Sequence, residues 1–266
     1  MSTSLNEMLA RYKAQIGPIT EMPEATARIL AHVLAWQKGL GIAGDVMEVG
    51  VFRAGTASLL ATSLEPAQRI FLIDPFQQEA ANRKTIVDFA KVEAKQLIFL
   101  LTDSMMVNKW RERMLAPQVP LVRFAHIDGE HSYDAVYSDI DLAYRFLAPG
   151  GLIVLDDIFD TDHACCTHAL FDYLRDQPFI HLVAMGCRKA YLCDSKSLPQ
   201  YRSFFEKMPD LLSSAGFPIR LCFNSWGHER SYYTFCQCNA ADLRYQIIGK
   251  RFATFAEAEA AWQKRG

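Results

Sequence analysis

Short continuous apolar runs recur up to residue 194, and each run ends at a polar or glycine-containing turn. Short runs bounded by turn signals are typical of strands that are buried on both faces of a parallel sheet. Segments with apolar residues at helical spacing separate these runs and also precede the first one. The alternation predicts a doubly wound α/β fold. The predicted strands are 45–49, 69–73, 97–101, 122–127 and 152–155, and the predicted helices are 5–16, 24–39, 80–95, 133–147 and 164–175.

The pattern changes after the helix at 164–175. Two apolar runs, 180–185 and 190–193, are joined by a tight turn and predict an antiparallel pair. We therefore expect a Rossmann-like sheet of seven strands that ends in an antiparallel hairpin, unlike the usual dinucleotide-binding sheet. Beyond residue 194 the pattern predicts a helix (199–215), three strands (219–224, 231–239 and 245–252) and a last helix (254–264). The expected parts are an N-terminal helical segment (1–44), a ligand-binding α/β domain (45–195) and a small C-terminal α+β lobe (196–266).

Composition limits the kinds of molecule that we expect this protein to bind. Half of the 266 residues are hydrophobic and the formal net charge is -2, so nothing favours nucleic acid or an anionic membrane as a partner. No apolar run reaches the length of a membrane span, and the N-terminus lacks an apolar signal core, so we expect a cytoplasmic protein. The seven cysteines have no CxxC spacing, which favours reduced thiols over a zinc site.

Two strand ends predict a nucleoside ligand. The first strand runs into a glycine turn and then a helix, a layout that can cradle a phosphate or a carboxylate. Asp74, followed by Pro75, ends the second strand, where an acid can accept hydrogen bonds from both ribose hydroxyls. Asp103 and Ser104 end the third strand and can either contact an adenine edge or cap the next helix. The candidate binding residues of the first turn are Glu48, Gly50, Val51, Arg53, Gly55 and Thr56.

Acidic residues gather at the ends of the next two strands. Asp128, with His131 close behind it, ends one strand, and Asp156 and Asp157 end the other. Carboxylates that converge on one sheet edge repel each other unless a cation or a proton is present, and Mg²⁺, Ca²⁺ or Mn²⁺ suits such oxygen ligands. His131 titrates near neutral pH when unperturbed and is therefore a candidate general base.

With these residues in order, the chain resembles the class I S-adenosylmethionine-dependent methyltransferases over about residues 46–194. Glu48 to Gly55 matches the first cofactor-binding motif of that family, and Asp74 matches the acid that binds the ribose. Asp103 and Ser104 fall where the family contacts adenine, and the resemblance places Asp128 at the cofactor as well.

Residues 127–157 are similar to the metal-dependent O-methyltransferases. The likeness is strongest to the branch that acts on antibiotic sugars and related natural products, such as macrocin O-methyltransferase and cephalosporin-pathway relatives. In that branch three acids hold Mg²⁺, and the matching positions are Asp128, Asp156 and Asp157. Catechol O-methyltransferase has an asparagine at the last position. The branch usually has Gly-Gly-Ser where this chain has residues 54–56, Ala-Gly-Thr.

The resemblance implies an S-adenosylmethionine-dependent enzyme that methylates a hydroxyl of a small molecule with the help of Mg²⁺. Either His131 or Asp128 would take the proton, and a homodimer is expected by analogy. Three other interpretations stay open at this point: a non-catalytic cofactor-binding protein, a methyltransferase that needs no metal, and a nicotinamide-dependent oxidoreductase. The last of these leaves the acidic segment without a use.

Overall fold

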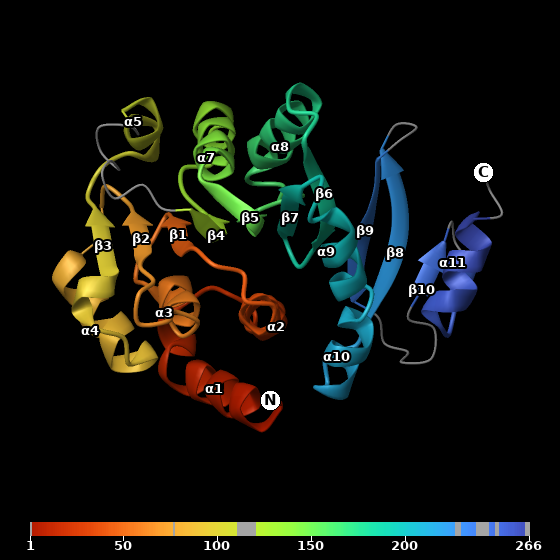
Figure 1. The fold of residues 1–266 in the computed structure, drawn as a ribbon, viewed down its shortest axis with the longest axis horizontal. Helices are drawn as coiled ribbons and strands as arrows, with labels where there is room; N and C mark the ends of the chain where they lie inside the picture. Colours follow the sequence, from red (N-terminus) through yellow and green to blue (C-terminus); the bar gives the residue numbers. More distant parts are fainter. Residues whose placement is uncertain are drawn as a thin grey trace.

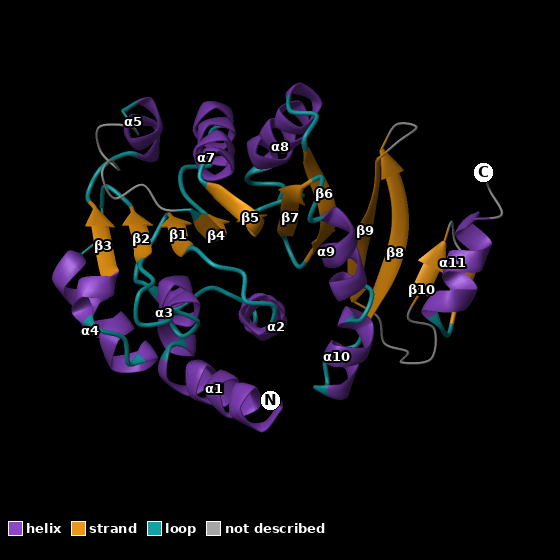
Figure 2. Cartoon of the chain, in the orientation of Figure 1, coloured by secondary structure: helices purple, strands orange, loops and turns teal. Residues whose placement is uncertain are grey.

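One β-sheet extends through the molecule, with helices on both of its faces (Figures 1 and 2). The computed structural model describes residues 2–76, 78–110, 121–226, 230–237, 245–247 and 250–263. The strands are β1 (Asp45–Val49), β2 (Ile70–Ile73), β3 (Leu97–Leu100), β4 (Val122–Ile127), β5 (Leu147–Leu155), β6 (Ile180–Gly186), β7 (Lys189–Asp194), β8 (Ile219–Trp226), β9 (Arg230–Gln237), β10 (Tyr245–Ile247) and β11 (Lys250–Phe252). The helices are α1 (Ser2–Gln15), α2 (Glu24–Gly39), α3 (Gly55–Ala61), α4 (Glu79–Ala90), α5 (Ser104–Lys109), α7 (Tyr133–Arg145), α8 (Ala164–Asp176), α9 (Leu198–Phe205), α10 (Met208–Ser214) and α11 (Phe255–Gln263).

The strand order confirms the α/β prediction but extends it. The order is β11-β10-β8-β9-β6-β7-β5-β4-β1-β2-β3, which makes eleven strands among the described residues and not seven. Strands β1 to β5 pair in parallel, and β7 lies antiparallel between β5 and β6. The sheet does not end at this hairpin, because β9 pairs in parallel with β6 and brings the C-terminal strands into the same sheet. The predicted division of the chain at residues 44 and 195 stays a prediction.

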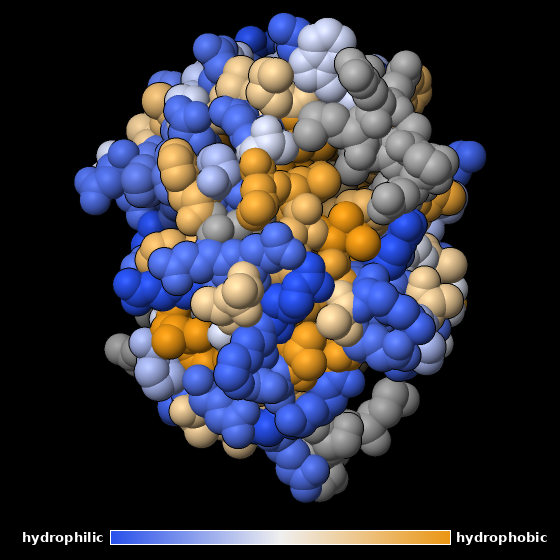
Figure 3. All heavy atoms as spheres, turned by 90° about the vertical axis from the view of Figure 1, so that its left-hand side faces the viewer, coloured by the Kyte–Doolittle hydropathy of each residue, from blue (hydrophilic) through white to orange (hydrophobic). Residues whose placement is uncertain are grey.

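The two faces of the sheet carry two separate hydrophobic cores. Helices α5, α7 and α8 cover one face, while α1 to α4, α9 and α10 lie on the other (Figure 1). Successive strand residues alternate between these cores: in β1, Val46 faces the α1–α4 side and Met47 faces the α7 side. The edge strand β3 is less buried, and the side of the molecule that carries it shows hydrophobic patches among hydrophilic residues (Figure 3).

Several element boundaries depend on local backbone chemistry. Helix α4 ends at Ala90, before the predicted residue 95, because Lys91 takes a left-handed conformation with φ of 61°. The predicted helix 199–215 is two helices, and a proline in the first turn of α10 marks the second start. Among the described residues, no helix is long and apolar enough to cross a membrane.

A buried polar network joins elements that are distant in the sequence. The Arg123 guanidinium, 1% exposed, donates to Gln37 Oε1 at 3.0 Å and to the Ser63 hydroxyl at 2.8 Å. Gln37 Nε2 donates to the Arg123 carbonyl at 2.8 Å and to the Tyr201 hydroxyl at 2.7 Å. Tyr201 in turn donates to the Gly150 carbonyl at 2.7 Å. The network ties α2 and α9 to β4 and β5, and burial lowers the pKa of Arg123.

The ends of β1 and β4 approach each other more closely than a side chain would allow. A Cβ added at Gly50 would lie 1.8 Å from the Asp128 carbonyl oxygen and 2.4 Å from its carbonyl carbon. Gly50 also has a φ of 81°, which disfavours any residue with a Cβ. The backbone amide of Asp128 donates to the Val49 carbonyl at 2.8 Å, so both loops leave the sheet in contact.

Gly50→Ala should therefore lower the free energy of unfolding by about 2 kcal/mol or more, since the methyl group overlaps backbone and the left-handed φ adds strain. Urea unfolding followed by circular dichroism measures this. Gly39→Ala is the matched control, because nothing lies within 4 Å of its added Cβ. Similar stabilities for the two variants would contradict the close approach.

Candidate functional site

The glycine turn after β1 is held by the acid that ends β2. Asp74 Oδ2 accepts hydrogen bonds from the backbone amides of Val51 and Phe52, each at 2.9 Å. Its Oδ1 accepts from the Phe76 amide at 2.7 Å. Phe52 and Ala54 have positive φ values of 47° and 61°, so the turn keeps a conformation that residues with a Cβ rarely adopt. Asp74 thus stabilises the loop, and its predicted contact with a ribose stays a prediction.

This turn and the acidic strand ends line one cavity of about 240 Å³. The predicted residues that meet there are Gly50, Val51, Arg53, Gly55, Thr56, Asp128, His131, Asp156 and Asp157. The segment before α2 closes another side of the cavity with residues 19–23. A Cβ at Gly55 would lie 2.6 Å from the Thr20 side chain, and Tyr12 donates to the Gly55 carbonyl at 3.1 Å. The N-terminal helices therefore help to form the wall of the site.

His131 lies between two of the acids. Its Nε2 is 2.8 Å from Asp157 Oδ2 and 3.8 Å from Asp128 Oδ1. The Asp128 carboxylate raises the pKa of His131 above its usual value, and burial opposes that shift. Burial also raises the pKa of Asp128. The His131 ring stacks on that of His163, with centroids 3.9 Å apart, which holds the imidazole in place.

Strand alternation gathers a second polar group beneath the cavity. Glu48 and His126 are partners in the β1–β4 register and point to the α1–α4 face. Asp156 follows β5 on the same face, and Lys189 begins β7 beside it because Ala190 pairs with Leu155. Lys189 Nζ contacts Asp156 Oδ2 and lies 3.1 Å from His126 Nε2.

The position of the proton on His126 follows from its contact with the Lys189 ammonium. An ammonium has only donors, so His126 Nε2 accepts from Lys189 and its Nδ1 carries the proton, 3.3 Å from Glu48 Oε1. Burial, followed by the Lys189 charge, lowers the pKa of His126 to about 3 and keeps the ring neutral. Burial holds the pKa of Glu48 well above its usual range, and its Oε2 has no hydrogen-bond partner among the described residues.

The acids proposed to bind a metal already have cationic partners in the protein. Asp157 contacts the Arg188 guanidinium, which also lies 2.5 Å from Asp160 Oδ2. Asp156 is engaged by Lys189, whose side chain is 3% exposed. The groups of potential ligand atoms found within 4.8 Å of one another among the described residues are His126, Asp128 and Asp156, and His131, Asp157 and His163. Neither group holds all three predicted acids, and two protein cations already occupy their oxygens. In this arrangement Asp128, Asp156 and Asp157 do not fit a common metal site. Magnesium at these three residues therefore stays a prediction.

The remaining predicted residues do not line the cavity. Asp103 caps α5, with Oδ1 accepting from the Met105 amide at 2.7 Å. Ser104 lies beside the buried Asp139, where burial raises the pKa of that carboxyl to about 7. Pro75 follows Asp74 outside the cavity wall. The capping interpretation of Asp103 is therefore what the structure shows, and contacts with adenine stay a prediction.

Sequence reasoning missed Arg188, Lys189 and His163. The signal for the first two was present, since both are basic and lie in the tight turn between β6 and β7. A hairpin that packs antiparallel against β5 must bring its turn to the acidic end of β5, and two cations there predict ion pairs. His163 carried no such signal, because its position depends on the path of the loop before α8.

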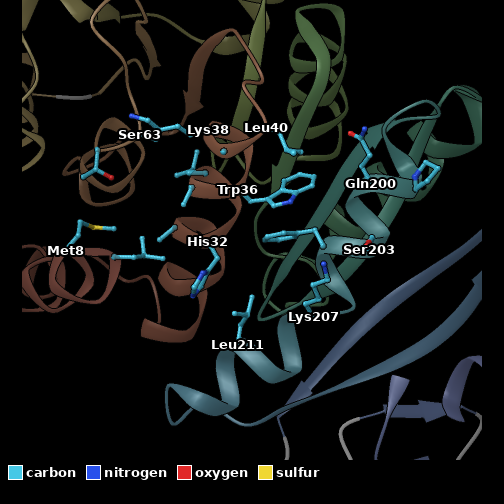
Figure 4. A pocket seen from close by; sticks show the side chains of 18 residues that line it. Met8, His32, Trp36, Lys38, Leu40, Ser63, Gln200, Ser203, Lys207 and Leu211 are labelled. Atoms are coloured by element: carbon cyan, nitrogen blue, oxygen red, sulfur yellow. The ribbon is translucent and has the colours of Figure 1, made fainter. Parts of the chain in front are cut away.

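A larger cavity, of about 1250 Å³, lies away from these residues (Figure 4). It opens between α2 and the pair α9 and α10, with Trp36 and His32 on one side and Gln200, Ser203 and Lys207 on the other. None of the predicted site residues lines it. The titratable groups with displaced pKa values converge instead at the smaller cavity, which favours that cavity as the functional site.

Part of the chain is similar to known proteins. Residues 47–158 match the family described as a methyltransferase domain. A search among curated proteins finds no match by sequence. A protein from Corynebacterium glutamicum is similar in structure, with 19% identity and a TM-score of 0.53 over 71% of this chain and 89% of that one. The O-methyltransferase TomG from Streptomyces achromogenes, which is involved in tomaymycin synthesis and was solved in complex with SAM, has 17% identity and a TM-score of 0.52, over 71% of this chain and 89% of its own.

At these identities the structural likeness establishes a shared fold, and the family match covers the β1-to-β5 unit that builds the cavity. The glycine turn and the acidic strand ends lie within or beside the matched residues. On this evidence residues 47–158 match a methyltransferase domain, and the chain shares its fold with O-methyltransferases such as TomG.

Proposed function

We propose that this enzyme transfers the methyl group of S-adenosylmethionine to a hydroxyl group of a small molecule, such as a sugar or another natural product. One observation carries the proposal: the glycine turn and the His131 group line the same cavity. A cofactor seated on that turn would present its methyl group beside a histidine that can accept a proton. TomG, which shares the fold, is an O-methyltransferase of small-molecule synthesis and supports the assignment by analogy.

The cofactor needs a shaped pocket and an anchor for its charged end. Asp74 holds the turn at Gly50 and Val51 rigid. This favours cofactor binding, because the turn loses little conformational freedom when the cofactor binds. Arg53 lines the same cavity and offers a cation to the methionine carboxylate of the cofactor. Residues 19–23 shield this region from water on the α2 side.

The reaction is a displacement at the methyl carbon. The acceptor oxygen forms a bond to the methyl group while the carbon–sulfur bond breaks, and the sulfonium becomes the neutral thioether of S-adenosylhomocysteine. The hydroxyl proton passes to the His131 imidazole, which the Asp128 and Asp157 carboxylates orient and stabilise once it is charged. Asp128 is the alternative proton acceptor, since it faces the same cavity.

Other interpretations fare differently. The methyltransferase family match leaves the nicotinamide-dependent oxidoreductase without support. A protein that binds the cofactor without catalysis would have no use for a histidine held between two carboxylates at the cavity. A homodimer and a cytoplasmic location both remain expectations, as do Mg²⁺ at Asp128, Asp156 and Asp157 and the identity of the acceptor.

The direct test combines binding with transfer. Calorimetric titration with S-adenosylhomocysteine should show micromolar binding, about -8 kcal/mol, as expected for a product that fills a preformed pocket. Isotope-labelled S-adenosylmethionine should then deliver label to members of a panel of hydroxylated sugars and phenols. Binding without transfer to any hydroxyl, together with transfer to amines or thiols, would refute the proposed acceptor class.

Asp74→Ala should weaken S-adenosylhomocysteine binding about tenfold or more, because the amides of Val51 and Phe52 both lose their charged acceptor. The same calorimetric titration measures the effect. Asp74→Asn keeps one acceptor oxygen and should lie between the parent and the alanine variant. An unchanged affinity in both variants would mean that the turn does not need Asp74.

His131→Ala should lower the turnover number about 10²- to 10⁴-fold, the usual contribution of a positioned general base, and leave S-adenosylhomocysteine affinity nearly unchanged. His168→Ala is the matched control, because His168 is exposed on α8. Steady-state rates with the best acceptor from the panel decide the outcome. If His131→Ala retains its rate while Asp128→Asn loses it, Asp128 is the proton acceptor.

A further inference from the structure

Lys189 is buried beside the acids of the cavity. Its Nζ contacts Asp156 Oδ2 and lies 3.1 Å from His126 Nε2, and its side chain is almost fully buried. These contacts use two of its three N–H donors, and the third has no partner among the described residues. Lys189 is also among the residues that line the cavity.

The backbone pairing of the β6–β7 hairpin holds Lys189 at this position. Lys189 pairs with Gly186 across the hairpin turn, and its successor Ala190 pairs with Leu155 at the end of β5. The carbonyl of Arg188 accepts from the Ile158 amide at 2.9 Å, which ties the turn to the segment that carries Asp156. Cys187 and Arg188 both have left-handed φ values, 53° and 63°, so the turn has little freedom to move Lys189 elsewhere.

Arg188 differs from Lys189 in this respect. Its guanidinium contacts Asp157 and Asp160, but its side chain is 57% exposed. A cation entering from solvent could displace it into water at little cost. The buried ammonium of Lys189 has no such alternative, and a divalent cation on Asp156 would stand beside a like charge.

We propose, on the basis of the proposed function, that Lys189 takes the place of a divalent metal in this enzyme. Its ammonium neutralises Asp156 in the way that a bound cation would, so methyl transfer proceeds without Mg²⁺. In this proposal the third N–H donor of Lys189 holds an acceptor oxygen, and the proton of the reacting hydroxyl passes to a base that lines the same cavity, His131 or Asp128. No oxidant or further reactant is required, since the methyl carbon exchanges its bond to sulfur for a bond to oxygen.

The experiment compares the parent enzyme with Lys189→Met, both freed of metal by a chelator. Binding of Mn²⁺ is followed by electron paramagnetic resonance, and methyl transfer is measured with chelator and with added Mg²⁺. We expect the parent enzyme to transfer methyl groups at rates that agree within about twofold with chelator and with Mg²⁺, because the proposed reaction uses no metal that the chelator could remove. Lys189→Met should bind Mn²⁺ about tenfold or more tightly than the parent, because the like charge is gone. Its transfer rate should fall about tenfold or more in chelator and recover with Mg²⁺.

Two further variants separate charge from structure. Lys189→Arg keeps the positive charge, and its transfer should remain insensitive to chelator even if its rate is lower. Lys196→Met removes an exposed lysine from the same region of the chain and should behave as the parent does in both measurements. If Lys189→Met does not fold, the parent and Lys189→Arg still test the proposal through Mn²⁺ binding and the effect of chelator.

The outcomes are distinct. A parent enzyme that loses transfer in chelator and regains it with Mg²⁺ overturns the proposal, as does Lys189→Met with unchanged Mn²⁺ affinity. Absence of transfer to every hydroxyl acceptor, in all proteins and conditions, is instead a failure of the proposed function. In that case the Mn²⁺ titrations still decide whether Lys189 excludes a metal.

Discussion

The site depends on the close contact between the ends of β1 and β4. Gly50 presses against the carbonyl group of Asp128, and no side chain fits between them. Neighbouring strand ends are linked in the same way: the Gly50 amide donates to Ile73, and the Asp156 amide donates to Ile127. Each loop that carries a functional group is therefore held by the hydrogen bonds of the strand beside it. The cofactor turn and the acids keep their spacing because the sheet sets it.

The same sheet explains why charge can be buried here. Alternation along adjacent strands places Glu48, His126 and Lys189 on one face, where all three are buried, and Asp156 follows the end of β5 beside them. A buried charge is tolerated when a partner of opposite charge and hydrogen bonds accompany it. Lys189 and Asp156 satisfy this condition for each other, and neutral His126 accepts a further N–H. Strand residues, with Asp156 directly after the end of β5, thus carry this buried charged group.

Much of this architecture could be predicted from local pattern. Helix α2 and strand β1 have the predicted bounds, and the glycine turn and His131 meet at one cavity, because strand ends in a parallel sheet share an edge. The partners of the acids follow from the strand order and not from local pattern alone. Lys189 reaches Asp156 only through the antiparallel pairing of β7 with β5, a contact between segments distant in sequence. The extension of the sheet by β9 was missed for the same reason, since apolar runs reveal strands but not their neighbours.

The buried network around Arg123 has a consequence for exchanging parts between related enzymes. Gln37 serves this arginine and Tyr201 at once, so one amide joins the helix before the sheet to the helix after β7. A chimaera that takes its first forty residues from a relative without glutamine at position 37 would leave the buried Arg123 guanidinium without one of its acceptors. Transplanting the N-terminal helices to alter the acceptor therefore requires positions 37, 123 and 201 to travel as a set.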